Sequence, residues 1–408
     1  MGRSRQKLGV WLVGASGNVA TTVAVGLAAL RKGLGPPIGL ISEQPPCNAL
    51  GLTPLSGMVL GGHEIGRRSA VASAESLRRE SRIFDEALLR AVRPALLCYE
   101  KNIRPGTAVR CGAAIDRLAT RPIARRKESA RRIIDRLRRD LRSFTRRNGL
   151  HRVVVIHLAS TEPMFKMGRA HREWHALNKA LNRRHSPLPA SSLYAIAAIE
   201  EGMPFVNFTP SLGADVPAIL ELATEAGVPI AGSDGKTGET LLKTVLAPMF
   251  RDRYLRIESW VGHNILGNSD GRVLDTSANK AAKLGTKDRV VSALVGYKPE
   301  TRTSIEYVAS LNDWKTAWDH VQFSGFLGTK MTLQFVWQGC DSILAAPLVI
   351  DLARLADAHA EQGGSGVMTH LACFFKSPMG VSEQGFARQV EMLHRYVSEV
   401  RKPRKSRR

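Results

Sequence analysis

Short apolar runs, glycine-containing turns and helical segments alternate through the first 240 residues of the chain. The apolar run 8–14 is followed by small residues and then by a helical segment. A helix over 193–202 precedes the short strand 205–208, and the region 217–240 repeats helix, glycine, strand and glycine-rich loop. Because parallel strands need long crossovers, usually helices, this alternation predicts an α/β fold with a doubly wound parallel sheet.

The rest of the first half adds two strands and one strongly amphipathic helix. We expect a strand over 37–42, a long loop over 44–63 and a strand over 151–158. The segment 128–147 predicts a helix whose apolar residues fall on one stripe while arginines occupy the other faces. That stripe consists of Ile133, Leu137, Leu141 and Phe144.

The sequence changes character after residue 250. Four segments are typical of longer strands, some with alternating polar and apolar residues, and they predict a separate sheet-rich domain. They are 256–265, 289–297, 303–311 and 329–339. Helices return from residue 341, followed by an apolar strand over 370–375 and a last helix before a basic tail.

The 408 residues carry a net charge of +23, and much of this charge is concentrated in two segments. Thirteen Lys and Arg residues, against three acids, lie in 117–147, and the tail 401–408 adds six basic residues and no acid. Such segments can bind polyanions non-specifically, but most basic clusters are solvated surface. We therefore do not expect nucleic acid as the main partner.

Three features bear on the cellular location. No apolar run approaches the ~18–20 residues that a membrane-spanning helix requires, so no membrane partner is expected. The N-terminal segment is typical of a first strand and turn rather than of a signal peptide. The five cysteines include no CxxC pair, which favours reduced buried thiols and a cytoplasmic protein.

The first glycine-rich turn, Gly14-Ala-Ser16-Gly17-Asn18-Val19-Ala20-Thr21-Thr22, lies between a strand and a helix. Its small residues let the backbone turn sharply and approach a pyrophosphate, which would rest on the first amides of the helix. This context favours dinucleotide binding over a purely structural turn. Glu43, at the end of the next expected strand, is a candidate to bind a ribose hydroxyl, although its spacing from Gly14 is long.

Two more glycine-rich segments carry polar side chains. The loop 232–240, GSDGKTGET, lacks the order of a Walker loop, but its hydroxyls and amides at a helix start suit a phosphate monoester. The segment 264–271, NILGNSDG, is followed by Lys280, Lys283 and Lys287. Such lysines usually form a solvated face. The alternative is a set of converging cations around an acidic substrate, where mutual repulsion lowers a lysine pKa.

Lys376 directly follows the apolar segment 370–375. It is either the exposed end of a strand or a ligand-binding residue, because ligands of parallel α/β sheets bind at the C-terminal ends of strands. His63, His157 and His263 lack the spacing and the cysteine companions of a zinc site. We expect these histidines to have structural hydrogen-bonding roles.

Taken in chain order, these segments resemble the myo-inositol-1-phosphate synthase (inositol-3-phosphate synthase) family. The family's G-x-G-G-N-x-G-T-T turn is similar to GASGNVATT, and its N-H-L-G-N-N-D-G segment is similar to NILGNSDG. The resemblance covers almost the whole chain, from about residue 8 to 380. Further similar segments are LGGHEI (60–65), IHLASTEP (156–163), GSDGKTGET (232–240), CDSILAAPLVIDL (340–352) and CFFKSP (373–378).

The resemblance implies an NAD-dependent isomerase (an intramolecular lyase) that converts D-glucose 6-phosphate to 1D-myo-inositol 3-phosphate. In that reaction C5 is oxidised, the C6 protons become acidic, C6 attacks C1 in an aldol closure, and the hydride returns. The implied fold is a Rossmann-like domain with an inserted sheet-rich α+β domain for catalysis and homotetramer assembly. The expected parts are 1–240 for NAD binding, 241–340 for catalysis and oligomerisation, 341–400 returning to the first domain, and the basic tail 401–408.

The resemblance also implies residue roles, position by position. The catalytic group would be Lys283, Lys287, Lys376, Asp234 and Asp341. The NAD contacts would be Gly14, Ser16, Gly17, Asn18, Val19, Glu64, Thr161 and Asp270. The contacts to the substrate phosphate would be Thr237, Gly238, Thr240, Asn268 and Lys287, and a monovalent or divalent cation stays open.

The chain departs from the family pattern at several positions. Glu306 stands where eukaryotic members carry a lysine, Ser16 replaces a glycine, Glu64 an aspartate and Leu241 a lysine. An acid at 306 cannot bind phosphate as a cation does. Two other interpretations therefore stay open: an NAD-dependent sugar-phosphate dehydrogenase of the same fold, and a non-catalytic homologue that binds NAD or polyanions.

Overall fold

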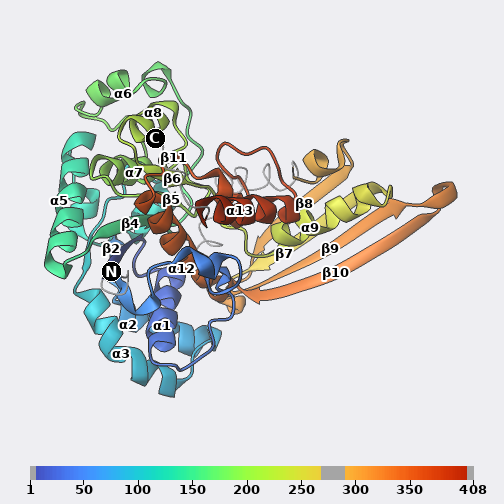
Figure 1. The fold of residues 1–408 in the computed structure, drawn as a ribbon, viewed down its shortest axis with the longest axis horizontal. Helices are drawn as coiled ribbons and strands as arrows, with labels where there is room; N and C mark the ends of the chain where they lie inside the picture. Colours follow the sequence, from blue (N-terminus) through green and yellow to red (C-terminus); the bar gives the residue numbers. More distant parts are fainter. Residues whose placement is uncertain (1–5, 268–289, 402–408) are drawn as a thin grey trace.

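The computed structural model describes residues 6–267 and 290–401, which form two sheets and the helices around them. In Figure 1 the seven-stranded sheet lies among helices, and the four-stranded sheet extends away from it to one side. Residues from both sheets reach the candidate site.

Every pair of neighbouring strands in the first sheet is parallel. The order is β11-β6-β5-β4-β1-β2-β3, so the chain winds outward in both directions from β1. This is the dinucleotide-binding order with one short strand added, and it confirms the predicted doubly wound sheet. The strands are β1 (Leu8–Val13), β2 (Met58–Glu64), β3 (Ile103–Pro105), β4 (Arg152–His157), β5 (Phe205–Asn207), β6 (Pro229–Ala231) and β11 (Gly366–Val367).

Side chains of the central strands alternate between two hydrophobic clusters, one on each face of the sheet. From β1, Leu8, Val10 and Leu12 enter one cluster, whereas Trp11 and Val13 enter the other. The helices of the first cluster are α1 (Asn18–Arg31), α2 (Ala70–Ser76), α3 (Glu86–Glu100), α12 (Asp341–Glu361) and α13 (Phe386–Arg401). Those of the second are α4 (Ala113–Leu118), α5 (Ala130–Asn148), α6 (Trp174–Ala180), α7 (Ala190–Glu200) and α8 (Pro217–Glu225).

Short 3₁₀ segments and one π-helical turn connect these elements. The 3₁₀ segments are Ile41–Glu43, Cys47–Leu50, Leu55–Gly57, Pro122–Arg125, Arg169–His171, Ala309–Leu311, Phe326–Gly328 and Thr369–Phe374, and the π-helical turn is Leu77–Ser81.

The predicted amphipathic helix is confirmed as α5, whose apolar stripe is buried in the second cluster. Three of its arginines form ion pairs with glutamates at the end of α7. Arg131 and Arg138 lie 2.8 and 2.9 Å from Glu200, and Arg138 and Arg142 lie 2.6 and 3.0 Å from Glu201. Part of the basic charge of this helix is therefore paired within the fold.

Two predictions around the second strand are wrong. Residues 37–42 form no strand, because Gly39 has φ +91° and a 3₁₀ turn begins at Ile41. The second strand, β2, lies instead within the segment expected to be a loop, whose glycines argued against a strand. Those glycines permit close packing: a Cβ on Gly61 would lie 2.8 Å from the Phe144 ring, and one on Gly62 would collide with the Leu12 carbonyl oxygen.

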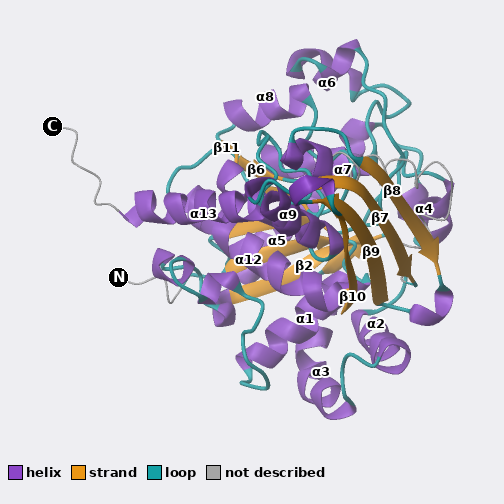
Figure 2. Cartoon of the chain, turned by 90° about the vertical axis from the view of Figure 1, so that its right-hand side faces the viewer, coloured by secondary structure: helices purple, strands orange, loops and turns teal. Residues whose placement is uncertain are grey.

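The second sheet is mixed, with the order β10-β9-β7-β8. β7 pairs in parallel with β8, and β9 pairs antiparallel with β7 and β10. In Figure 2, α9 (Glu239–Asp252) lies beside the strands of this sheet. Together with the helical residues 290–295 it covers one face of the sheet and packs against Trp260 and Val321. The strands are β7 (Arg256–Leu266), β8 (Glu300–Tyr307), β9 (Trp314–Ser324) and β10 (Lys330–Cys340).

Three of the four strands predicted in this region are confirmed as β7, β8 and β10, and β9 was not predicted. The strand expected over 289–297 is wrong, because residues 290–295 are helical and bury Val290, Val291 and Leu294 against the sheet. The strand expected over 370–375 is also wrong. Most of that segment is a 3₁₀ turn, and only Phe375 forms a bridge, with Gly235.

All five cysteines are free thiols. Four are buried as predicted, but Cys98 is exposed, so the expectation is wrong at that position. Within residues 6–267 and 290–401, no helix is long and apolar enough to cross a membrane.

A buried carboxylate fixes the loop after β4. Glu162 is 5% exposed and accepts hydrogen bonds from the Ser191 amide at 2.8 Å, from the Ser191 hydroxyl and from the Cys111 thiol. Burial raises the pKa of Glu162 from 4.5 to about 7, although the Ser191 hydrogen bonds oppose this shift. Between these two pH values the folded protein holds a proton that the unfolded chain releases.

The free energy of unfolding should therefore fall as the pH rises from about 4.5 to 7, because the folded state binds more protons than the unfolded chain. Glu162→Gln cannot titrate, so its stability relative to wild type should improve by about 1–3 kcal/mol between pH 5 and pH 8. Denaturant unfolding of both proteins at the two pH values measures this change. Parallel pH dependence in the two proteins would show that Glu162 is ionised throughout.

Candidate active site

One cleft lies at the C-terminal edge of the first sheet, where the loops after β1, β4 and β5 meet the starts of α1 and α12. The loop before α9 and the segment around the start of β9 complete its wall. The cleft brings together residues far apart in the sequence. They are Ser16, Gly17, Asn18, Val19, Ala20, Arg68, Leu158, Ala159, Ser160, Thr161, Phe208, Thr209, Pro210, Asp234, Gly235, Thr237, Asp313, Lys315, Asp341, Ser342, Ala345 and Lys376.

The turn after β1 requires glycine at its first position. Gly14 has φ +88°, and a Cβ there would lie 3.0 Å from the Ala159 Cα. The amides of Gly14 and Ala15 donate to the His63 carbonyl oxygen at 2.9 and 3.1 Å. These contacts join β1, β2 and the loop after β4 at the base of the cleft.

Two side-chain hydroxyl groups donate hydrogen bonds to backbone carbonyl oxygens of this turn. The Tyr99 hydroxyl donates to the Ala15 carbonyl oxygen at 2.8 Å, and the Ser73 hydroxyl donates to the Ser16 carbonyl oxygen at 2.9 Å. Both donors come from helices, since Ser73 lies in α2 and Tyr99 in α3. The turn is therefore fixed by the helices of the first hydrophobic cluster.

Glu64 ends β2, the position from which an acid reaches a ribose hydroxyl in this fold. Its Oε2 accepts a hydrogen bond from the Ser16 amide at 2.8 Å, so two positions that depart from the family pattern contact each other. The prediction for Glu43 is wrong. Glu43 lies in a 3₁₀ turn rather than at a strand end, and its Oε1 accepts from Arg354 Nη1 at 2.5 Å.

The start of α1 is open to an anion. Its N-cap, Gly17, makes no side-chain hydrogen bond to the first-turn amides, and a Cβ there would lie 3.2 Å from the Gly14 carbonyl oxygen. The Ser16 hydroxyl is buried and has no hydrogen-bond partner among the described residues. An uncapped helix start beside a buried hydroxyl suits a pyrophosphate group.

A second, narrower pocket continues from the cleft across the turn. It shares Ala159 and Ser160 with the cleft and is also lined by Gly14, Glu64 and Thr107. A dinucleotide needs space on both sides of the turn, because its two nucleosides lie across the strand ends. The residues present therefore fit NAD.

Lys376 and Asp234, two residues implied to be catalytic, form an ion pair in the wall of the cleft, with Nζ 2.9 Å from Oδ1. Their backbones are also joined, because the Lys376 amide donates to the Asp234 carbonyl oxygen at 2.7 Å. Asp234 has φ +62°, a left-handed conformation that is uncommon outside glycine and that clusters at functional sites.

A buried lysine in the loop that carries Asp234 connects this loop to α13. Lys236 is 3% exposed, and its Nζ donates to Gln389 Oε1 of α13 at 2.5 Å. Burial lowers the pKa of Lys236 to about 8, with a smaller contribution from the Lys376 charge. Lys236 thus attaches α13 to the loop that carries Asp234.

The residues implied to bind the substrate phosphate lie at the start of α9. Thr237 lines the cleft, and Gly238 is the helix N-cap without a side-chain hydrogen bond. Thr240 is buried in the first helical turn, and its hydroxyl has no hydrogen-bond partner in the part of the chain that the structure describes. Hydroxyls at an uncapped helix start are groups that bind a phosphate.

Sequence analysis missed several charged residues of the cleft. Asp341, which it did identify, begins α12 and lines the cleft beside Ser342. Asp313 and Lys315 enter from the second sheet, and Arg68 enters from the segment before α2. No local pattern signals these three residues, because contacts between distant segments bring them to the cleft.

Four implied site residues lie outside the described residues, so no contact is assigned to them. They are Asn268, Asp270, Lys283 and Lys287. Glu306 is exposed on β8 and pairs with Ile265 of β7. Over residues 6–267 and 290–401, no group of three His, Cys, Asp or Glu residues could hold a metal ion.

The histidines make hydrogen bonds within the fold. His63 accepts from Trp11 Nε1 at 2.8 Å, and its Nε2 lies 3.2 Å from Asp140. His157 Nδ1 lies 3.2 Å from the Thr209 hydroxyl, and burial lowers the pKa of His157 to about 3. These contacts fit the structural roles expected for them.

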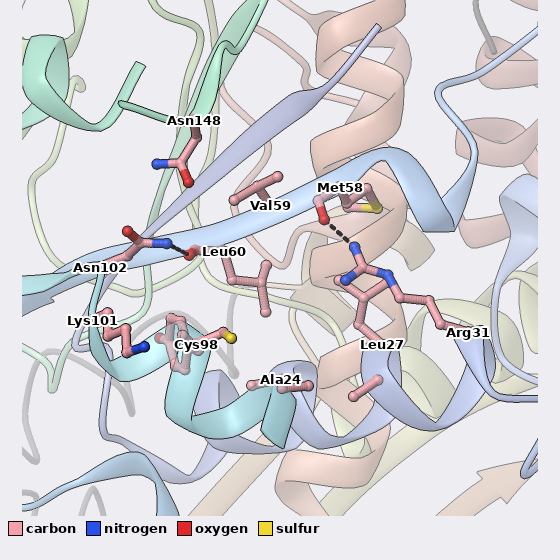
Figure 3. Close-up of a pocket in the computed structure, with 13 residues that line it drawn as sticks. Ala24, Leu27, Arg31, Met58, Val59, Leu60, Cys98, Lys101, Asn102 and Asn148 are labelled. Atoms are coloured by element: carbon pink, nitrogen blue, oxygen red, sulfur yellow. Dashed lines mark hydrogen bonds between the residues drawn. The ribbon is translucent and has the colours of Figure 1, made fainter. Parts of the chain in front are cut away.

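Figure 3 shows a different pocket, between α1, α3 and the first residues of β2. Much of its polar lining is already bonded. Arg31 donates to the carbonyl oxygens of Leu55 and Met58, and Asn102 Nδ2 donates to the Leu60 carbonyl oxygen at 3.0 Å. Because ligands of this fold bind at the C-terminal ends of strands, the cleft and not this pocket is the candidate active site.

Comparisons with known proteins agree with one another. The family model described as Myo-inositol-1-phosphate synthase, an NAD-binding family, matches residues 8–397. The chain is 36% identical over 398 residues to Inositol-3-phosphate synthase 1 of Bacteroides thetaiotaomicron. The match covers 91% of this chain and 90% of that protein. It is 30% identical over 399 residues to the inositol-3-phosphate synthase of Trypanosoma brucei brucei, covering 87% of this chain and 73% of that protein.

Among solved structures, the crystal structure of inositol-3-phosphate synthase from Caenorhabditis elegans has a similar fold. The TM-score is 0.85 at 22% identity, and the match covers 97% of this chain and 86% of that one. At this identity the likeness shows the fold, a Rossmann-like parallel sheet with a separate mixed sheet. Because the family model matches nearly the whole chain and a relative of similar length is 36% identical, the chain belongs to the myo-inositol-1-phosphate synthase family.

Proposed function

We propose that this chain is an NAD-dependent inositol-3-phosphate synthase that converts D-glucose 6-phosphate to 1D-myo-inositol 3-phosphate. Its relatives in Bacteroides and Trypanosoma are named for inositol-3-phosphate synthesis. The observation that carries the proposal is the Lys376–Asp234 pair in the same cleft as the uncapped start of α1. A fixed ammonium group beside a dinucleotide-binding site suits oxidation at a sugar carbon followed by proton transfer.

The turn after β1 would hold the cofactor. Gly14, Ser16, Gly17, Asn18 and Val19 would contact the pyrophosphate through the turn and the start of α1, Glu64 would bind the adenosine ribose, and Thr161 would line the opposite wall. When bound, NAD supplies a hydride acceptor and then a hydride donor for C5, so the reaction has no net oxidation.

Lys376 would act where negative charge develops on the substrate. Its ammonium group can donate a hydrogen bond to a substrate oxygen that becomes negatively charged during the oxidation and the cyclisation. Asp234 fixes the direction of that group, because Oδ1 lies 2.9 Å from Nζ and the two backbones are joined. A preorganised donor of this kind needs little reorientation during the reaction.

The remaining roles rest on the family resemblance. Lys283 would exchange a proton at the C5 oxygen, and Lys287 would bind the phosphate or the C1 oxyanion. Asp270 and Asp341 would orient lysines or cofactor. The phosphate would be bound by Thr237, Gly238, Thr240 and Asn268.

Glu306 does not conflict with this proposal. Glu306 lies on β8, on one side of β7, and it is not one of the described residues that line the cleft. Lys315 lies on β9, on the other side of β7, and it does line the cleft. The negative charge at 306 therefore need not face the substrate phosphate.

We also propose a homotetramer assembled through the second sheet. On the face away from α9, His263, Trp318 and Val336 lie directly opposite one another in β7, β9 and β10. Val336 is 65% exposed, and His263 stacks on Trp318 with ring centroids 5.7 Å apart. This exposed row of an aromatic and an aliphatic side chain supports the proposed interface.

The domain boundaries 1–240, 241–340 and 341–400 and the basic tail 401–408 belong to the same proposal. A cytoplasmic location is proposed too, because free thiols suit a reducing compartment.

Purified protein incubated with D-glucose 6-phosphate and NAD⁺ should form inositol 3-phosphate without accumulating NADH, since the hydride returns to the product. Phosphorus NMR identifies the product, and absorbance follows the cofactor. Accumulated NADH would indicate a sugar-phosphate dehydrogenase. Unchanged substrate from protein that binds NAD would indicate another sugar phosphate or a non-catalytic homologue.

Lys376→Met should lower kcat at least about 100-fold while NAD affinity stays within a factor of about two, because Met fills the space but donates no hydrogen bond. Asp234→Asn should lower kcat less, since the ammonium group remains but loses its charged partner. Lys101→Met, beside the pocket of Figure 3, is the control and should keep wild-type activity. A Lys376→Met enzyme with wild-type kcat would remove Lys376 from the reacting centre.

Val336→Glu should break the tetramer into smaller species, because each interface would then bury a charge. Light scattering after size exclusion measures the mass. Val245→Glu on α9, where the parent side chain is 46% exposed, is the matched control and should leave the mass unchanged. A tetramer that survives Val336→Glu would place the interface elsewhere.

A further inference from the structure

One buried carboxylate from the second sheet contacts the starts of two helices that face the cleft. Asp313, just before β9, is 2% exposed, and its Oδ1 accepts a hydrogen bond from Asn18 Nδ2 of α1 at 2.8 Å. Its Oδ2 accepts from the Ser342 amide of α12 at 3.1 Å and from the Cys340 thiol at 3.0 Å. None of the residue roles implied by the family resemblance includes Asp313.

Backbone contacts hold Asp313 in place independently of its side chain. Its carbonyl oxygen accepts from the Asp341 amide at 3.0 Å, and its own amide donates to the Ser81 hydroxyl at 3.3 Å. The carboxylate is therefore presented to both helix starts by a fixed backbone, and a change of the side chain alone leaves that backbone anchored.

The two helix starts differ in their acidic groups, because the start of α12 has Asp341 in its first turn and contacts the Asp313 carboxylate through the Ser342 amide, whereas the first turn of α1 contains no acid. Both carry the partial positive charge that attracts a phosphate. In α12 the Ser342 amide is covered by the Asp313 carboxylate, whereas the N-cap of α1, Gly17, covers none of its first amides. Asn18 is the first residue of α1, and its side-chain amide is held by Asp313, so this carboxylate contacts the helix start that the pyrophosphate would use.

We propose that Asp313 is a positioning residue that directs the pyrophosphate of NAD to the start of α1. It fixes the Asn18 side chain at the first residue of α1, and its negative charge, together with that of Asp341, disfavours a second anion at the start of α12. The same contacts fix the second sheet, including Lys315, relative to the cofactor. The inference rests on NAD binding by this family and not on the proposed sugar-phosphate reaction.

The first test is NAD binding to Asp313→Asn. This variant keeps the size of the side chain but removes its charge and turns an NH₂ group toward either Asn18 or the Ser342 amide. The dissociation constant for NAD, measured by calorimetry without sugar phosphate, should rise about tenfold. Asp85→Asn is the matched control, because Asp85 caps α3 through the Leu88 amide at 2.6 Å outside the cleft. It should leave NAD affinity unchanged, because Asn is as good an N-cap as Asp and the site lies outside the cleft.

A second measurement separates positioning from a purely structural role. In an Asn18→Ala background the hydrogen bond from Asn18 to Asp313 is already absent, so the loss caused by Asp313→Asn should shrink at least about threefold. An equal loss in both backgrounds would overturn the proposal, as would unchanged NAD affinity in Asp313→Asn. Because every readout is cofactor binding, failure of the proposed isomerase reaction would leave these results intact.

Discussion

The candidate site depends on how closely three backbone segments approach one another at the end of β1. Gly62 of β2 packs against the Leu12 carbonyl group, and Gly14 packs against Ala159 in the loop after β4. A side chain at either glycine would push these segments apart. The first amides of the turn use the His63 carbonyl oxygen, which leaves the later amides at the start of α1 available to a ligand. The close approach therefore produces both the tight turn and the open helix start.

A second backbone contact completes the site from the C-terminal part of the chain. The loop 232–236 pairs with residues 374–377, at and after the end of the last 3₁₀ turn. The Ser233 amide donates to the Ser377 carbonyl oxygen and the Lys236 amide to the Phe374 carbonyl oxygen, both at 2.8 Å. Buried peptide groups need partners, and this irregular pairing supplies them without a regular strand. It leaves the side chains of Asp234 and Lys376, 142 positions apart in the sequence, in contact at the cleft.

The sequence was sufficient where the pattern is local. The stripe of α5, the apolar run of β4 and the glycine turn after β1 each carry their own periodicity or context, and each was predicted correctly. β2 was missed because glycines in a sequence favour a loop. That Gly61 and Gly62 lie in a strand follows only from their close packing against Phe144 and Leu12. The segment 289–297 failed for a different reason, since a short apolar run fits a buried helix as well as a strand.

The same distinction applies to the site. The resemblance singled out Asp234, Lys376 and Glu64, and the structure places the first two in contact and Glu64 at the end of β2. Glu43 was proposed from its place at the end of an expected strand, despite its long spacing from Gly14, and was wrong because that strand does not exist. Asp313 could not be predicted, because its significance lies in a contact with Asn18 from the other end of the chain.

The net positive charge of the protein can attract anionic ligands, but it cannot determine which anion binds at which helix start in the cleft. The chain carries a net charge of +23, yet in the cleft Lys376 is paired with Asp234, and Asp313 and Asp341 line it together with Lys315 and Arg68. Basic surface outside the cleft can attract anions from solution over about 8–10 Å at physiological ionic strength. NAD and a sugar phosphate are both anions, so net charge cannot tell one from the other. The start of α1 offers open amides and the start of α9 offers hydroxyls as well, and different sets of hydrogen-bond donors of this kind can assign each anion to its own helix.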